Sequence, residues 1–328
     1  MGDLGEAAHM TLFRRLLTTL ALALLLGGCE RAPAPPPAPA QPPGPAEALT
    51  RLMQDLRRND LAGYARHAVP PAVHDQLEQA WQEGRTVWPL TELPLDDRIA
   101  PMITALSAPR AERQLTATFK QQFSGAGREL RAAASTVGLF AGQYVASAEE
   151  YSDEERDHYR QMIAAFSKWG QRAPLADGKL ASAALPRLIG AARGTGLAGP
   201  DAFAKAGMDK ALGRLGPFFR TAKDVLRTYD LDLDAALDSI QPTLAEQTGD
   251  TARLRVRYTL AGHQIDAHVR AERRDGQWYL TDLVRHAEAE AAAGRSAENA
   301  QAGLAGPSVA SQAGPSAAPE KTPPTAPR

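Results

Sequence analysis

Apolar side chains recur with a helical period over residues 47–238. They lie three or four positions apart, the spacing that places side chains on one face of a helix. Asn59-Asp60 and Pro70-Pro71 interrupt the pattern and predict where one helix ends and the next begins. The apolar stripes are Leu49, Leu52, Met53 and Leu56; Val73, Leu77 and Trp81; Leu115, Phe119 and Phe123; and Phe203, Met208, Leu212 and Leu215. We therefore expect a helical region over residues 47–238.

Two segments of this region have features of their own. Residues 132–145 are apolar or small almost all round, which is typical of a helix buried between other helices. Ser152 and Glu155 have the spacing of a capping box and predict a helix that begins there and ends near Gly170. The acidic run Glu149–Asp157 is either a cation site or the favourable negative charge of a helix's first turn, and the second interpretation needs no ligand.

From about residue 239 the period of the pattern is two, as in strands with one buried face. Ala261-Gly262 predicts a two-residue hairpin loop, with Tyr258 facing Ile265 and Arg257 facing Asp266. We expect a further strand over 243–247 and, after the Asp275-Gly276 turn, another over 277–284. The predicted fold class is α+β. A helix-rich N-terminal and middle part precedes an antiparallel meander of three to four strands, over residues 239–290, packed on helices.

Two segments of the predicted meander resemble a sequence pattern of a known family. Gly249–Tyr258 reads Gly-Asp-Thr-Ala-x-Leu-x-Val-x-Tyr, and Asp275–Leu280 reads Asp-Gly-Gln-Trp-Tyr-Leu. This pattern resembles small bacterial lipoproteins with a nuclear-transport-factor-2-like fold, and the resemblance implies a cone-shaped α+β domain. The helical region of this chain is longer than the usual lead-in of that family. Whether residues 47–290 form one domain or two therefore stays open.

The N-terminal part predicts an export signal. Arg14-Arg15 precedes an apolar run, Leu16–Leu26, that is too short to span a bilayer, so we interpret residues 1–28 as a signal peptide. Met10 is the expected true start, because the residues before it carry two acids and no base. The sequence Leu26-Gly27-Gly28-Cys29 resembles the lipobox of bacterial lipoproteins. By that resemblance, Cys29 becomes the first residue of the mature chain and carries acyl groups; the alternative is an ordinary secretory signal with a chance cysteine.

Cys29 is the only cysteine in the chain, so no intramolecular disulfide can form. Acyl chains on Cys29 would hold a folded domain at the bilayer. Glu30 follows, whereas an aspartate there often signals inner-membrane retention in lipoproteins of this type. The resemblance therefore implies the bacterial envelope, periplasm-facing, with the outer membrane favoured over the inner membrane.

Both flanking segments have compositions that oppose a packed core. Residues 29–46 form a Pro-rich linker, with eight prolines among residues 33–46, and we expect an extended stalk or, alternatively, a docking site for an aromatic groove. Residues 291–328 are rich in Ala, Gly, Ser and Pro, which predicts a disordered tail.

Charge and motifs exclude several functions. Lys and Arg number 37 against 38 Asp and Glu, a balance that argues against a nucleic-acid binder. The Gly194–Gly199 segment matches G-x-G-x-x-G, but helix precedes it and Pro200 follows, so we expect a loop between helices. Asp230–Asp234 lacks the glycine and glutamate of a calcium loop and predicts a capped helix start. We predict no catalytic motif, no metal ligands and no cofactor.

The polar side of the strands is the candidate binding surface. It carries five cationic or titratable side chains: Arg253, Arg255, Arg257, His268 and Arg270. They could contact an anionic partner; alternatively, this is a solvated sheet face whose charge Asp266 and Glu272 partly balance.

Together these observations predict a membrane-tethered envelope lipoprotein that acts as a non-catalytic binding or protein-interaction module. Its expected partners are the lipid bilayer, through acylated Cys29, and an envelope protein or a small apolar ligand. A ligand-binding role predicts a pocket between the sheet's apolar face and the helices, whereas a structural role predicts that Leu254, Val256, Ile265, Val269 and Trp278 fill that space. The alternative function is an envelope hydrolase with a site assembled from residues distant in sequence.

Overall fold

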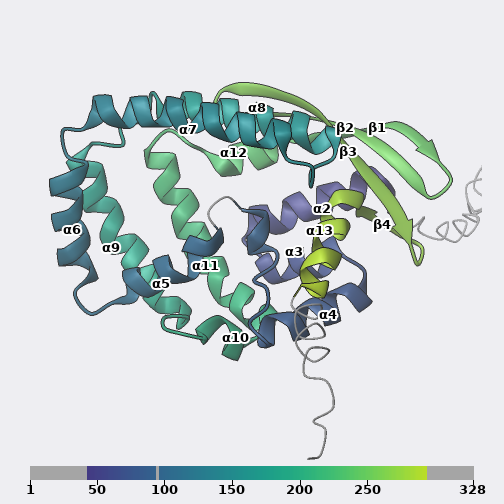
Figure 1. Cartoon of the computed structure of the whole chain (residues 1–328), viewed down its shortest axis with the longest axis horizontal. Coiled ribbons are helices and arrows are strands. Elements are labelled where there is room, and N and C mark those ends of the chain that lie inside the picture. The colour runs from purple at the N-terminus through teal and green to yellow at the C-terminus, as the bar shows by residue number, and fades with distance from the viewer. Residues whose placement is uncertain (1–42, 94–95, 294–328) are drawn as a thin grey trace, which may run out of the picture. The chain divides into compact units, whose positions relative to one another are not determined.

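A computed structural model describes residues 43–93 and 96–293 of the chain. The signal peptide, Leu26, Gly27, Gly28, Cys29, most of the Pro-rich linker and the tail from residue 294 lie outside these described residues, and their predictions stay predictions. The elements in chain order are α2 (Pro45–Arg58), α3 (Leu61–Ala68), α4 (Pro71–Gln82), η1 (Leu90–Glu92), η2 (Asp96–Arg98), α5 (Ile99–Ser107), α6 (Ala111–Gln122), α7 (Gly127–Ser147), α8 (Asp153–Gly170), α9 (Gly178–Thr195), α10 (Ala202–Ala206), α11 (Met208–Thr228), α12 (Leu233–Asp238), β1 (Gln241–Thr248), β2 (Thr251–Leu260), β3 (His263–Arg274), β4 (Gln277–Leu280) and α13 (Thr281–Ala292). The α+β class is confirmed: helices come first and an antiparallel sheet follows (Figure 1).

The sheet is a meander in the order β1-β2-β3-β4, with every neighbouring pair antiparallel. Tyr258 faces Ile265 and Arg257 faces Asp266, as the hairpin pattern predicts. Ala261 and Gly262 both have positive φ, 51° and 79°, which is the backbone sign of a type I′ turn. The local alternation and the loop length were therefore sufficient to fix the register.

The last strand is shorter than predicted. The expected strand over 277–284 stops at Leu280, and α13 begins at Thr281. Only residues 271–274 of β3 pair with β4. After the strand the buried positions change to helical spacing, Val284, Ala287 and Ala291, and they pack into the core of the helical part. The meander therefore ends on a helix that ties it to the rest of the unit.

Several helix boundaries follow the predicted signals. Asn59 ends α2 in the left-handed conformation, and the Asp60 carboxylate caps α3 by accepting a 2.8 Å hydrogen bond from the Gly63 amide. Gly196 ends α9, so the glycine-rich segment 194–199 is the end of a helix and the loop after it. Asp232 caps α12 through the Ala235 amide, as the capped-start interpretation of Asp230–Asp234 predicts.

The core has two main parts. The apolar face of the sheet packs on α2, α8 and α12, with Leu254, Val256 and Ile265 almost fully buried. Helices α3, α4, α5, α9, α11 and α13 enclose the second part, which includes Trp81 and Leu212. Side chains fill the sheet's apolar face as the structural interpretation predicts, although Val269 is half-buried and Trp278 belongs to a small separate cluster with Ala252 and Ala271.

Helix α7 differs most from its prediction. Residues 132–145 are helical, but they are not buried between other helices, because α7 packs mainly on α8 and leaves its other side open. Only Val145 is a buried residue of α7. Figure 1 shows α7 and α8 lying side by side. None of the described helices is long and apolar enough to cross a membrane.

Candidate functional site

The predicted basic surface forms on the outer face of β2 and β3. Arg253, Arg255 and Arg257 are exposed along β2, and the pairing places Arg270 and His268 opposite the first two. His268 and Arg270 are only half exposed, because α8 packs along β3. The strand alternation therefore predicted that these side chains share one face of the sheet. It did not predict that α8 lies beside them.

Most of these cations have carboxylate partners. Arg255 Nε donates to Asp266 Oδ1 at 2.8 Å, and this hydrogen bond holds the pKa of Asp266 below its usual range. Arg253 lies 3.5 Å from Glu154 of α8, and Arg270 lies 2.7 Å from Asp282 of α13. Within the described residues, Arg257 and His268 have no ion-pair partner. The free positive charge is thus smaller than the sequence pattern suggests, and the anionic partner stays a prediction.

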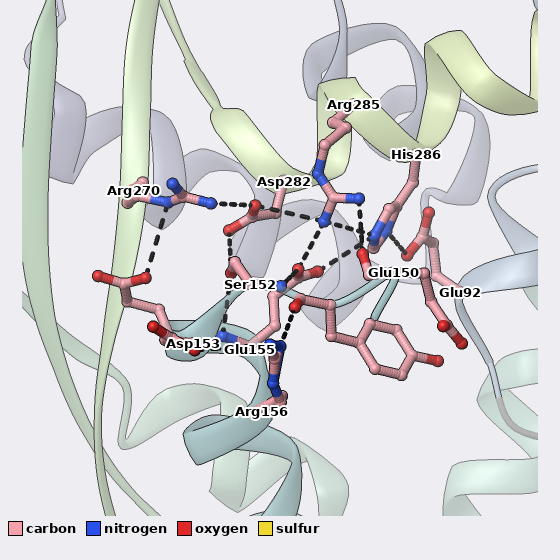
Figure 2. Close-up of polar contacts among 12 residues, drawn as sticks. Glu92, Glu150, Ser152, Asp153, Glu155, Arg156, Arg270, Asp282, Arg285 and His286 are labelled. Carbon is pink, nitrogen blue, oxygen red and sulfur yellow. Dashed lines mark hydrogen bonds and ion pairs between the residues drawn. The ribbon is translucent and has the colours of Figure 1, made fainter. Parts of the chain in front are cut away.

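The densest group of charges lies where the first turn of α8 meets α13, and Figure 2 shows it. We define the α8–α13 cluster as Glu92, Ser152, Glu155, Arg270, Asp282, Arg285 and His286. The predicted capping box forms its base: the Ser152 amide donates to Glu155 Oε2 at 2.8 Å, and the Glu155 amide donates to Ser152 Oγ at 3.2 Å. Asp153, Glu154 and Glu155 of the acidic run lie in the first turn of α8 and provide favourable negative charge there. In the described part of the chain, no group of three or more His, Cys, Asp or Glu side chains is placed to hold a metal ion.

Glu155 connects this cap to α13. Its carboxylate is buried and accepts a 2.6 Å hydrogen bond from Arg285 Nη2, while its other oxygen lies 3.2 Å from His286 Nε2. His286 Nδ1 lies 3.0 Å from Glu92 Oε2, and Glu92 Oε1 accepts from the indole of Trp88 at 3.1 Å. Ser152 Oγ also donates to Asp282, at 3.1 Å. Elements far apart in the chain are therefore fixed to one another by charge-assisted hydrogen bonds.

The position of His286 between two carboxylates changes its protonation. The hydrogen bond to Glu92 is the main cause that raises the pKa of His286, partly opposed by burial and by the charge of Arg285. Arg285 Nη2 also lies 3.1 Å from His286 Nε2. In the protonated ring both nitrogens donate and a guanidinium accepts no hydrogen bond, so we assign Glu155 as the partner of Nε2. The same carboxylates, after the larger effect of burial, raise the pKa of Tyr159.

Sequence reasoning found only the local half of this cluster. Ser152 and Glu155 are three positions apart, and the capping-box spacing identifies them. Glu92 and His286 are 194 positions apart, and no motif joins them. Every charged member of the cluster has an ion-pair partner, although Arg270 Nε is buried without a hydrogen bond. The arrangement is that of a structural clamp between α8, α13, β3 and η1.

The histidines also bear on the hydrolase alternative. Asp55 Oδ2 lies 2.7 Å from His67 Nδ1, a carboxylate–histidine pair of the kind that orients a catalytic base. A nucleophilic site also needs a hydroxyl on the other ring nitrogen, and at His67 that nitrogen contacts Arg51 instead. Across residues 43–93 and 96–293, no serine or threonine hydroxyl is hydrogen-bonded to a histidine. The hydrolase alternative stays a prediction.

At least three hollows open on the surface of the helical part. One, of about 600 Å³, lies between α4, α5 and α10 and is lined by Trp81, Val87, Pro101 and Phe203 among others. A second, of about 450 Å³, lies at the start of α9 beside Phe119. A third, of about 660 Å³, lies beside α6 and is lined by Arg110, Arg113 and Lys120 among others. None of these three borders the sheet's apolar face, where a ligand-binding role predicts a pocket.

The outer side of α7 is the most apolar exposed surface among the described helices. Val137, Leu139, Phe140 and Tyr144 are each 60–65% exposed. The side of α7 that faces α8 carries small residues instead, and Ser167 Oγ of α8 donates to the Ala134 carbonyl at 3.0 Å. An exposed group of large apolar side chains on one helix is typical of an interaction surface.

Comparison with known proteins finds no matching family model, no matching curated protein and no matching solved structure.

Proposed function

We propose that this chain is a lipid-anchored protein of the bacterial envelope, held at the bilayer through Cys29 and acting there as a non-catalytic binding module. The observation that carries the proposal is the position of Cys29. The only cysteine of the chain follows a short apolar run and two glycines, where a lipid-attachment site would lie. Glu30 in the next position supports the outer membrane.

The described unit supports a role in binding through a surface. The sheet's apolar face is packed with side chains, and the charged side chains of the α8–α13 cluster are ion-paired, so neither offers an open cleft. The outer side of α7, in contrast, leaves large apolar side chains in solvent. A module that docks by a surface needs such a face, whereas a ligand carrier needs a cavity.

The proposal is tested by metabolic labelling with a fatty-acid probe in a bacterial host. We expect the wild-type chain to take up the label and to sediment with membranes. A Cys29→Ala variant loses the label and the membrane association that depends on it, because acyl chains supply about 0.8 kcal/mol per buried methylene. A wild-type chain that stays unlabelled would overturn the proposal.

A further inference from the structure

The outer side of α7 is uncharged over most of its length. Between Arg131 and Glu149 the sequence has no Asp, Glu, Lys or Arg, although α7 is a surface helix. Surface helices of water-soluble proteins carry charged side chains on their open side, because these residues stay hydrated at little cost. The open side of α7 instead presents Val137, Phe140 and Tyr144 at helical spacing along one flank, whereas the exposed Leu139 lies on the opposite flank.

Positive charge gathers at the beginning of this helix. Arg128 and Arg131 lie in its first two turns and are exposed, and Lys120 lies near the end of α6. Glu129 offsets one of these charges. A helix with an apolar open face and cationic side chains at one end is suited to the boundary between lipid headgroups and acyl chains, where the cations meet phosphate.

We propose that the outer side of α7 lies on the bilayer surface, with Val137, Phe140 and Tyr144 inserted among the lipid headgroups. This inference rests on the proposed lipid anchor and adds a second contact to it. Pro43 lies fourteen positions after Cys29, and a polyproline segment of fourteen steps would span about 43 Å. The anchor thus keeps the described unit within reach of the membrane, where even weak insertion of one helix face is favoured by the high effective concentration.

A second copy of the chain is the rival occupant of this face. Ala133, Val137, Phe140 and Tyr144 have a spacing that two helices could share. The positions beside them, Thr136 and Gln143, are uncharged, so no ion pairs would set the register or orientation of such a pair. Binding to a bilayer does not require a fixed register or orientation between two helices. The lack of charged residues beside the apolar face therefore favours a bilayer over a second copy of the chain.

The test uses the chain from residue 29 to its end with Cys29→Ser, which retains every described residue and lacks the acyl anchor. Vesicles of phosphatidylethanolamine and phosphatidylglycerol in equal parts are mixed with it and sedimented. We expect wild-type sequence at α7 to bind, and the double substitution Val137→Ser and Phe140→Ser to lower the partition coefficient by roughly tenfold or more. Leu244→Ser, which changes an exposed apolar residue of β1, is the matched control and leaves binding unchanged.

Insertion is measured directly with a single introduced cysteine, since the Cys29→Ser chain has no other. An environment-sensitive dye at Gln143→Cys is expected to shift to shorter wavelength on adding vesicles, whereas the same dye at Gln247→Cys on β1 does not shift. Circular dichroism checks that each variant keeps its helix content.

Two results would overturn the inference. One is a chain that does not bind the vesicles; fatty-acid labelling of Cys29 in the same host then shows whether the anchor itself stands. The other is a chain that forms dimers, combined with no dye shift when vesicles are added. If the Val137→Ser and Phe140→Ser substitutions dissociate those dimers, the outer side of α7 contacts a second copy and not lipid.

Discussion

Glu155 has two roles in the same position. Its carboxylate completes the capping box of α8 with the Ser152 amide, and it is the buried counter-ion of Arg285 and His286 on α13. Removing one member of a buried charge cluster leaves its partner without compensation, which costs more than the pair contributes when intact. The stability of this junction therefore depends on the protonation of His286.

The pH dependence of stability follows from the raised pKa of His286. The folded state holds the proton more tightly than the unfolded chain, in which a histidine titrates near pH 6.5. The stability that His286 contributes is thus fully present below that pH and is lost as the pH rises through the folded-state pKa. We expect His286→Gln to lower the free energy of unfolding by about 2 kcal/mol at pH 6, and by less at pH 8.5.

Urea denaturation at the two pH values measures this difference. His268→Gln, on the outer face of the sheet, is the control and should change little at either pH. The groups that face His286 are Glu92, Glu155 and Arg285, with the ring of Tyr151 in edge contact. An equal loss of stability for His286→Gln at pH 6 and pH 8.5 would show that the ring contributes by packing and not by its charge.

At the scale of single residues, the sequence predicts what is local. The Ser152–Glu155 cap, the Asn59–Asp60 boundary and the Arg257–Asp266 pairing are set by spacings of a few residues or by a two-residue turn. The partner of Asp266 in the folded chain is Arg255, one diagonal away, since side-chain geometry and not register decides which arginine binds. The clamp at His286 depends on the fold as a whole, so no local pattern predicts it.

Helix α7 shows how a hydrophobic pattern can predict the element but not its environment. Its apolar composition favours burial, yet the small residues form the contact with α8 and the large ones point away. Small side chains let two helices approach closely, and that approach leaves no space for Val137 or Phe140 in the contact. The period of the pattern gave the helix correctly, while residue size decided which side is buried.

The close contact of α7 with α8 makes a specific prediction. A Cβ added at Gly138 would lie 2.5 Å from Ser167 Cβ, whereas a Cβ at Gly142, four residues later, would meet nothing within 4 Å. We expect Gly138→Ala to destabilise the chain by about 1–3 kcal/mol through overpacking. Gly142→Ala should stabilise it by up to about 1 kcal/mol, because alanine is the better helix former.

Urea denaturation of the two alanine variants tests the packing of α7. Each serves as the control for the other, since both make the same chemical change in the same helix. A Gly138→Ala variant at least as stable as Gly142→Ala would mean that α7 does not lie against Ser167, and the open face inferred for Phe140 would lose its basis.

Contacts at the edge of the sheet explain why α8 could be predicted as a helix but not placed. Gln161 of α8 donates to the Asp266 carbonyl at 2.9 Å and accepts from the Asp266 amide at 3.0 Å. It thereby satisfies backbone groups of β3 that β4, which pairs only with residues 271–274, does not reach. Where β4 ends early, α8 covers the edge of β3 that would otherwise be exposed. The alternation of apolar and polar residues along a strand does not predict which element covers its edge.

At the scale of the whole molecule, residues described from Pro43 onward belong to one compact unit. The helical region and the meander share core side chains, since Met53 and Leu280 pack against both main clusters. The described residues of the helical region and the meander therefore form one unit. The contacts that join them are between residues distant in sequence, and the periodicity of the sequence does not predict such contacts. The resemblance to nuclear-transport-factor-2-like lipoproteins and the role of the segment before Pro43 stay predictions.

The proposed lipid anchor, and with it the proposed membrane contact of α7, depends on acylation of Cys29. Mass spectrometry of the N-terminal peptide of the protein purified from bacterial membranes tests it most directly. The expected result is a mature chain that begins at Cys29 and carries acyl groups on that residue. A mature chain that begins elsewhere, or one that begins at an unmodified Cys29, would contradict the account.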